Sequence, residues 1–371
     1  MKLDNNQQAF IALVRAGLWN KEVRLLPSNI IDFKEVFQIA EEQSVVGLVA
    51  AGLEHVVDTK VPKKVLLTFV GRSLQIEQQN IDMNQFVAEL FEKLQKENVN
   101  ALLVKGQGTA QCYERPLWRA CGDVDLLLDA ENYERAKQVL LPQAVSVESE
   151  YKTFKHRGMT MGNGVEVELH GTMHTRLSKR VDSYIDRVQE DTFNKHKVRT
   201  WQSGDTEISI PAPDNDVIFL FTHILHHFYL EGIGLRQICD WCRFLWTYQK
   251  ELDVALLETR LCTMGLLSEW KTFAALAVDW LRMPADAMPL YSPLKRWSRK
   301  GNRIMDFVMK TGNFGHNRQR KRSVNYFIGK TQSAWHQMKD FGRHTLVFPM
   351  DSIKFFFNFI NSGIEVVVNK E

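Results

Sequence analysis

Two aspartates stand one residue apart in "CGDVDLLLDA", residues 121–130. Successive side chains of a strand alternate between its two faces, so Asp123 and Asp125 would project together, with Val124 on the opposite face. Aspartate is a poor strand former, and two like charges on one face repel each other. A bound cation would offset this repulsion, so the pair is typical of a cation-binding site. The alternative is a strand end with solvated acids.

A second acidic strand is predicted in "VEVELH", residues 165–170. Glu166, Glu168 and His170 alternate with apolar residues and would share one face. If this strand neighbours the first, three or four carboxylates converge, and their hard oxygen atoms favour Mg²⁺ or Mn²⁺ over zinc. A solvent-facing acid is the alternative for Glu168, and Glu166 is the rival ligand. His170 fits either a site or a strand end.

A glycine turn precedes the two aspartates. "KGQG", residues 105–108, follows a short apolar run that is typical of a buried strand, and it could open a helix. Gly106 and Gly108 would let the backbone approach a phosphate, and helix N-terminal amides favour anions. Lys105 and Arg119 could add positive charge there, or they could be ordinary surface charges. Together the turn and the aspartates would supply both halves of a metal–triphosphate site.

These residues resemble the pattern of the DNA polymerase β-like nucleotidyltransferase superfamily. Its members have a glycine turn, then an Asp-x-Asp strand, then a third carboxylate on a later strand. More narrowly, the chain is similar to a bacterial family of uncharacterised nucleotidyltransferases, with a "KG…Y…P…R…GDxDLL" block and a carboxylate two residues before a histidine. The matching residues are Lys105, Gly106, Tyr113, Pro116, Arg119, Gly122, Asp123, Asp125, Leu126, Leu127, Glu168, Leu169 and His170. The flanking "LRQICD" and "TGNFG" segments also look similar.

The resemblance implies a site and its ligands. Asp123, Asp125 and Glu168 would be the catalytic residues and would bind two Mg²⁺ or Mn²⁺ ions, which stabilise the attacking and leaving oxygens of a displacement. The NTP would be bound by Lys105, Gly106, Gln107, Arg119 and Gly122. The sequence departs from the superfamily pattern at Gln107, where a phosphate-binding serine is usual, and at Glu168, where aspartate is commoner.

The predicted function is therefore Mg²⁺-dependent transfer of a nucleoside monophosphate from an NTP to a hydroxyl acceptor, which the sequence does not identify. One alternative is a catalytically silent binding protein that keeps the nucleotidyltransferase fold. Another is an enzyme that modifies a protein, as in toxin–antitoxin relatives. The complete set of three carboxylates argues against the silent alternative.

The predicted fold class is α+β, with a small mixed β-sheet nucleotidyltransferase core embedded in helical N- and C-terminal regions. Apolar residues at three- and four-residue intervals predict helices within 7–57 and 62–97. Between 100 and 171 the pattern predicts four or five strands, including a hairpin that turns at Gly162–Gly164. The predicted regions are a helical 1–98, an α/β core at 99–212, and a helical 213–371 with a basic segment and an aromatic tail.

Composition limits the partners and the compartment. The chain is 44% hydrophobic and 25% charged with a net charge of +3, so a nucleic-acid partner is possible but not favoured. The N-terminus lacks the apolar core of a signal peptide, and the apolar runs are too short to span a membrane. Five cysteines, few and odd in number, fit reduced thiols. We therefore expect a cytoplasmic protein.

Four other features leave alternatives open. His223, His226 and His227 lack the glutamate of a zinc-protease motif, so we expect packed or acceptor-pocket histidines. Cys239 and Cys242 are expected to be buried thiols. The basic run at 315–330 fits a solvated loop, or a contact with an anionic acceptor or a membrane surface. The aromatic C-terminal tail fits a packed helix, with peripheral membrane contact as the alternative. We also expect Arg236 and Asp240 to line an acceptor pocket with the histidines.

Overall fold

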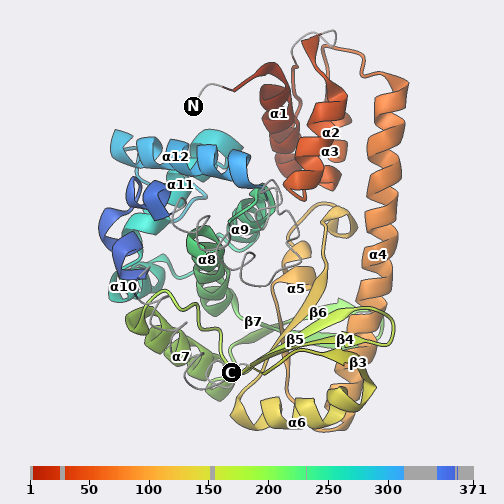
Figure 1. Cartoon of the computed structure of the whole chain (residues 1–371), viewed down its shortest axis with the longest axis vertical. Coiled ribbons are helices and arrows are strands. Elements are labelled where there is room, and N and C mark those ends of the chain that lie inside the picture. The colour runs from red at the N-terminus through yellow and green to blue at the C-terminus, as the bar shows by residue number, and fades with distance from the viewer. Residues whose placement is uncertain are drawn as a thin grey trace, which may run out of the picture.

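A long helix joins two parts of the molecule. The computed structural model describes residues 3–25, 30–150, 155–230, 232–312, 341–355 and 357. Its fold class is α+β, as predicted, with a five-stranded mixed sheet and a two-stranded sheet among helices. Helix α4 (Lys63–Lys96) runs along one side of the molecule from the N-terminal helices to the sheet (Figure 1).

In the described residues before α4, three α-helices pack closely together. They are α1 (Asn5–Trp19), α2 (Phe33–Glu42) and α3 (Val46–Leu53). The close approach of α1 and α3 requires glycine at two positions, because a Cβ on Gly17 or Gly52 would lie within 2.1 Å of a backbone oxygen of the facing helix. The predicted all-helical start of the chain is confirmed over its described residues.

The five-stranded sheet has the order β1-β2-β5-β4-β3. Its strands are β1 (Leu102–Val104), β2 (Asp123–Leu127), β3 (Ala144–Val147), β4 (His156–Met161) and β5 (Glu166–His170). The β2–β5 pair is parallel, and the other three pairs are antiparallel. The predicted hairpin is confirmed as β4 and β5, and the count of five strands agrees with the prediction.

The two faces of the central strands belong to different surroundings. Val124, Leu126 and Val167 pack in a core with side chains of α4 and of α6 (Ala130–Leu140). Asp123 and Asp125 point to the opposite face, toward the helical body. Strand alternation therefore puts the apolar side chains on a core-facing side of the sheet and the two aspartates on the other side.

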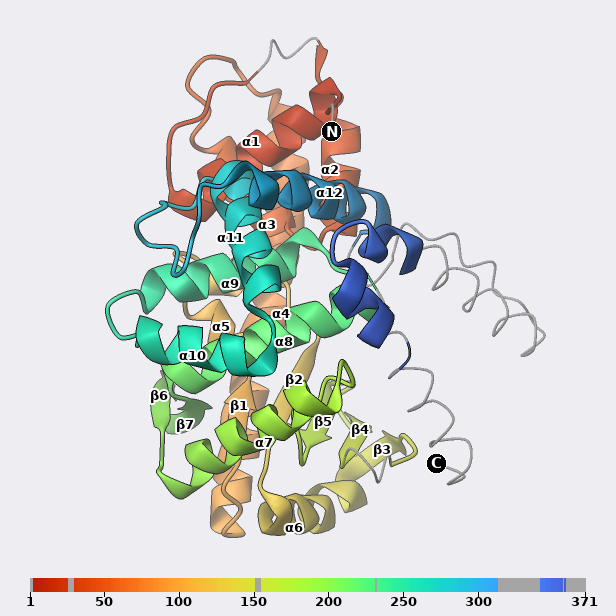
Figure 2. The same ribbon diagram turned by 90° about the vertical axis from the view of Figure 1, so that its left-hand side faces the viewer.

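The chain after the sheet is mostly helical. Helix α7 (Lys179–Asn194) and the hairpin β6 (Val198–Ser203) and β7 (Thr206–Pro211) were not predicted. The predicted helical region follows as α8 (Pro213–Leu230), α9 (Leu235–Thr247), α10 (Val254–Met264), α11 (Leu267–Leu281) and α12 (Lys295–Thr311). Figure 2 shows α8, α9 and α11 between the N-terminal helices and the sheet.

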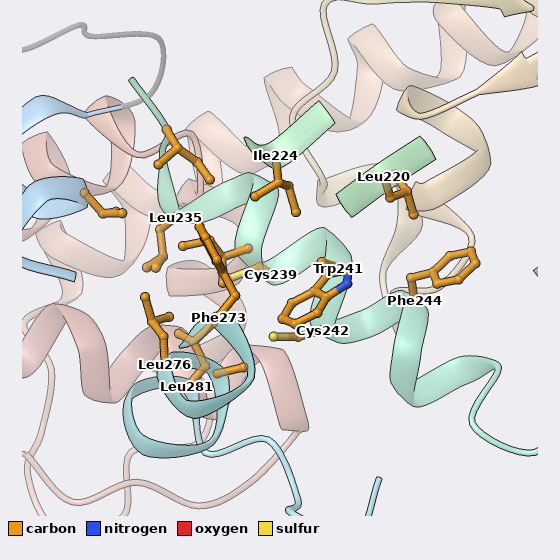
Figure 3. Close-up of a cluster of buried hydrophobic side chains, with 14 of the residues drawn as sticks. Leu220, Ile224, Leu235, Cys239, Trp241, Cys242, Phe244, Phe273, Leu276 and Leu281 are labelled. Carbon is orange, nitrogen blue, oxygen red and sulfur yellow. The ribbon is translucent and has the colours of Figure 1, made fainter. Parts of the chain in front are cut away.

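The centre of the helical body is apolar and contains the Cys-x-x-Cys pair. Cys239 and Cys242 of α9 lie among Trp241, Phe273 and other buried side chains (Figure 3), and neither thiol is exposed to solvent. Burial raises the pKa of both thiols. The prediction of buried thiols is confirmed.

Three features of the sequence lie partly or wholly outside the described residues. The basic run and most of "TGNFG" fall within 313–340, and the end of the aromatic tail falls within 358–371. The described part of the tail packs on the helical body, with Phe348 and Phe355 buried. In the described part of the chain no helix is both long and apolar enough to cross a membrane. The division into three regions stays a prediction.

Candidate active site

Strands β2 and β5 bring the predicted carboxylates together. Their parallel register places Asp123 beside Glu166 and Asp125 beside Glu168. Asp123, Asp125 and Glu168 line one cavity, whereas Glu166 is not part of its wall. The carboxylate of Glu166 instead accepts a hydrogen bond from Thr160 Oγ1 at 2.7 Å. Glu168 therefore shares the cavity with the two aspartates and Glu166 does not, while the role of Glu168 as a metal ligand stays a prediction.

Lys105 reaches this cluster from a strained turn. It precedes α5 (Gly106–Ala110) with φ 58° and ψ −140°, a conformation that costs about 1–3 kcal/mol in a residue with a side chain. Its Nζ donates to Asp125 Oδ1 at 2.7 Å, and the two side chains are 13% and 4% exposed. Helix α5 has only five residues, so its dipole contributes little to anion binding here.

Two histidines complete the cluster. His170 Nε2 lies 2.7 Å from Asp125 Oδ1 and 3.3 Å from Glu168 Oε2. His156 opposes His170 in the antiparallel pair, and its Nε2 lies 3.2 Å from the same Glu168 oxygen. Glu168 therefore lies between two imidazoles. His170 was a candidate from the sequence pattern, whereas His156 was not.

The three carboxylates differ in their electrostatic surroundings. Burial, followed by repulsion from Asp125, raises the pKa of Asp123. Burial opposes the ionisation of Asp125 too, but Lys105 and His170 outweigh it and lower the pKa of Asp125. Hydrogen bonds with the two histidines likewise outweigh burial and lower the pKa of Glu168. Asp123 is thus the least compensated of the three.

The cationic groups of the cluster are stabilised in turn. Burial opposes the charge on Lys105, but the neighbouring carboxylates, Asp125 first, raise the pKa of Lys105 above its ordinary value. Burial and Lys105 oppose the charge on His170, but its hydrogen bonds with Asp125 and Glu168 raise the pKa of His170. The ammonium group of Lys105 and the imidazole of His170, when protonated, therefore offset part of the negative charge of Asp125 and Glu168.

The cluster forms one wall of a cavity of about 600 Å³. The opposite wall comes from α8 and α9. It includes His223, His226, His227, Arg236 and Asp240. We expected Arg236 or Asp240, with at least one of these histidines, to share a cleft with the two aspartates, and this geometry is confirmed. A volume of this size is within the range of small-molecule sites.

Arg119 is both a structural residue and a cavity residue. It pairs with Asp240 through Nε to Oδ1 at 3.1 Å and Nη2 to Oδ2 at 2.7 Å. Tyr113 donates to the same carboxylate at 2.7 Å. The remaining Nη1 of Arg119 is buried and has no hydrogen-bond partner among the described residues. Arg119 therefore fixes α9 with one part of its guanidinium group and has another part to offer a ligand.

Thr109 is a cavity residue that the sequence analysis missed. It lies on α5 three residues after Gly106, and its buried hydroxyl has no hydrogen-bond partner within the described ranges. The side chain of Gln107 donates to Asn80 Oδ1 at 3.0 Å, and neither Gln107 nor Gly122 lines the cavity. Thr109 thus presents the kind of hydroxyl that position 107 lacks.

The α8 histidines make contacts of their own. His223 Nε2 and His227 Nε2 are 3.0 Å apart, and His226 Nδ1 lies 2.7 Å from the backbone oxygen of Thr175. Burial, and then the positive charge of Lys105, hold the pKa of His223 well below its ordinary value. These histidines are packed against each other and also line the cavity, so the two expected roles are compatible.

The donor set on the sheet wall fits a divalent cation. Asp123, Asp125 and Glu168 supply hard oxygen atoms, which Mg²⁺ and Mn²⁺ prefer. The raised pKa of Asp123 indicates a carboxylate that lacks sufficient positive charge nearby, and a cation would supply it. These three residues would therefore hold the metal that the resemblance implies.

Of the comparisons with known proteins, the match to a family model shows the family of this chain. No match is found among functionally curated proteins. One solved structure, an antigenic nucleotidyltransferase-like protein from Paracoccidioides brasiliensis, matches with 16% identity and a TM-score of 0.33, covering 54% of this chain and 92% of the other. That TM-score is too low to carry an argument. A family model described as uncharacterised nucleotidyltransferase matches residues 29–282, and this chain therefore belongs to that nucleotidyltransferase family.

Proposed function

We propose that this protein moves a nucleoside monophosphate from an NTP to a hydroxyl group of an acceptor, with the help of a divalent metal ion. The observation that carries the proposal is the convergence of Asp123, Asp125 and Glu168 on one wall of the cavity. Three carboxylates on one face repel each other, and this arrangement makes chemical sense when it serves a cation and a polyphosphate.

The metal ligands would be the same three carboxylates. A bound Mg²⁺ or Mn²⁺ would neutralise phosphate charge and stabilise the attacking and leaving oxygens of the displacement. In the transfer itself, the acceptor oxygen forms a bond to the α-phosphorus. The bond from this phosphorus to the bridging oxygen breaks, pyrophosphate leaves with the electron pair, and the proton of the acceptor hydroxyl passes to solvent.

Three donors on the cavity wall suit the triphosphate. Lys105 carries an ammonium group. Arg119 Nη1 and Thr109 Oγ1 are buried polar atoms without a partner in the described part of the chain, and buried polar groups normally have one. Phosphate oxygens would supply those partners. Binding through three fixed donors would hold the nucleotide in one orientation, which is where much of the rate of such a reaction comes from.

The helical wall would face the acceptor. It offers neutral imidazole at His223, whose pKa is held low by burial, and charged groups at Arg236 and Asp240. Phe219 and Ile224 add apolar surface to the same wall. We expect an acceptor with several hydrogen-bonding groups, because this wall offers both donors and acceptors.

The experiment is a substrate screen. The purified protein would be incubated with each of four α-labelled NTPs, Mg²⁺ or Mn²⁺, and fractions of a cell extract as the acceptor source. We expect a labelled product and released pyrophosphate with at least one NTP, only when metal is present. A D123N/D125N variant run in parallel should give neither. The proposal is contradicted if no NTP binds in the presence of metal and no pyrophosphate is released with any fraction.

A further inference from the structure

The sheet wall contains a nitrogen-rich corner that the carboxylate pattern does not explain. His156, Glu168 and His170 each offer one ligand atom, and these three atoms all lie within 4.8 Å of one another. The two histidines face each other across the β4–β5 hairpin, with ring centroids 4.9 Å apart. Mg²⁺ binds mainly oxygen ligands and binds imidazole weakly. Imidazole is a common ligand of transition metals.

We infer that His156, Glu168 and His170 form a binding site for a divalent transition-metal ion, such as Zn²⁺ or Mn²⁺, in preference to Mg²⁺. The inference deepens the proposed function, because Glu168 belongs to both. It changes the expected identity of the ion at the Glu168 end of the cluster, which three carboxylates alone would assign to a hard cation.

The spacing of the donor atoms supports a shared ion. Zinc bonds to histidine nitrogen and carboxylate oxygen are about 2.0–2.2 Å long, which puts neighbouring donors of a tetrahedral or octahedral ion roughly 3.0–3.5 Å apart. The distances from Glu168 Oε2 are 3.2 Å to His156 Nε2 and 3.3 Å to His170 Nε2. Both fall in that range. An ion would replace the protons that join Glu168 to the two imidazoles.

The surroundings suit an ion that also contacts a substrate. His156 and Glu168 are partly exposed on their side chains, at 25% and 35%, whereas His170 is 11% exposed. Three protein ligands with an open side are the arrangement of catalytic rather than structural metal sites. Asp125 Oδ1 lies 2.7 Å from His170 Nε2 and forms a hydrogen bond with this imidazole on the inner side. The open side faces the cavity, where a phosphate or acceptor oxygen can complete the coordination.

Position in the fold also explains why both histidines are there. They are registered partners in the antiparallel pair, and Glu168 lies two residues before His170 on the same face. The hairpin therefore delivers all three donors to one point. A mixed nitrogen and oxygen set binds first-row metals in the order Mn²⁺ below Zn²⁺, and magnesium is expected to be weaker than both.

The test measures metal binding without any nucleotide. Zn²⁺, Mn²⁺ and Mg²⁺ would be titrated separately into the full-length protein at about pH 8, since histidine binds metal in its neutral form. We expect Zn²⁺ and Mn²⁺ to bind at least about tenfold more tightly than Mg²⁺. His156→Ala should weaken Zn²⁺ and Mn²⁺ binding by at least about tenfold and leave Mg²⁺ binding nearly unchanged.

The matched control is His174→Ala. His174 lines the same cavity, but its Nε2 is held by Asp186 Oδ1 at 2.7 Å, outside the trio. This variant should bind all three ions as the wild type does. Pulsed electron paramagnetic resonance of Mn²⁺ bound to the wild type gives a readout that needs no variant, because nitrogen ligands produce ¹⁴N couplings.

The inference is overturned if Mg²⁺ binds as tightly as Zn²⁺ and Mn²⁺, if His156→Ala changes no affinity or all three equally, or if bound Mn²⁺ shows no ¹⁴N coupling. Failure of the proposed function looks different. In that case the metal titrations give the expected pattern, but no NTP is bound or turned over.

Discussion

The two walls of the cavity treat charge in opposite ways. On the α9 wall, Asp240 accepts hydrogen bonds from Nε and Nη2 of Arg119 and from the hydroxyl of Tyr113. On the sheet wall, Asp123 lies close to two further carboxylates, and the pKa of Asp123 is raised. The α9 wall is arranged for stability. On the sheet wall, the repulsion between Asp123 and its neighbouring carboxylates is not fully compensated, and a bound cation would relieve it.

This comparison predicts the largest effect for the sheet wall, on activity. Asp123→Asn with Asp125→Asn should reduce nucleotidyl transfer by at least about 10²–10³-fold, the range for losing a main electrostatic group of a site. It should also remove the rise in melting temperature that metal and NTP together give the wild type, since ligands of the native state stabilise by mass action. Differential scanning fluorimetry and the transfer assay measure both.

The control for this variant is its own stability without ligand. Asp123→Asn removes repulsion, but Asp125→Asn takes the charge partner away from Lys105 and His170, so the free energy of unfolding of the double variant should fall. Asp123→Asn alone should stay near the wild type in its free energy of unfolding, because burial and repulsion already raise the pKa of Asp123. An undiminished thermal shift in the double variant would show that the metal lies elsewhere.

The α9 wall should show the reverse, a large loss of stability. Arg119→Met leaves Asp240 buried without its partner, and breaking a buried pair costs about 3–5 kcal/mol. Replacing both partners at once, with Arg119→Met and Asp240→Leu, should recover much of that loss. Urea unfolding of the two variants measures the difference. If the single variant unfolds as the wild type does, the pair is not the structural element described here.

Glu269, a buried carboxylate outside both walls, should have a smaller effect, which is on the dependence of stability on pH. Glu269 of α11 is fully buried and accepts a hydrogen bond from Tyr229 at 3.3 Å. Burial, and then repulsion from Asp351, raise the pKa of Glu269 from 4.5 to about 8. The folded state therefore binds an extra proton between these pH values. The stability present below pH 4.5 is lost as the pH rises through about 8.

Glu269→Gln should flatten that decline, because glutamine stays neutral at every pH. The slope of unfolding free energy against pH should change by at most about 1.4 kcal/mol per unit. Denaturant unfolding over the same pH range would measure it. Parallel curves for wild type and variant would contradict the assigned shift.

The sheet wall was largely predictable from local sequence. Strict alternation in residues 165–170 and the leucine run after Asp125 reveal two strands, and the Asp-x-Asp spacing puts two acids on one face. Even His156 had a signal. A hairpin centred on Asn163 places residue 156 opposite residue 170, so the expected turn already implied that His156 and His170 meet.

The contacts of the α9 wall were harder to predict from the sequence. Arg119 and Asp240 are far apart in sequence, and no local pattern indicates that they pair. Arg119 was therefore predicted as a possible phosphate ligand and not as a structural residue.

The β6–β7 hairpin could have been predicted from the sequence. Ile208 and Ile210 alternate with polar residues after a turn at Gly204, a pattern typical of a strand.

The most direct test of the central claim compares Glu168 with Glu166, two glutamates on one face of one strand. Glu168→Gln and Glu166→Gln would be assayed side by side for transfer and for NTP binding with metal present. We expect Glu168→Gln to lose transfer but still to bind NTP, through Lys105, Arg119 and Thr109. Glu166→Gln should stay within about twofold of the wild type. Loss of transfer in Glu166→Gln, with normal transfer in Glu168→Gln, would contradict the site described here.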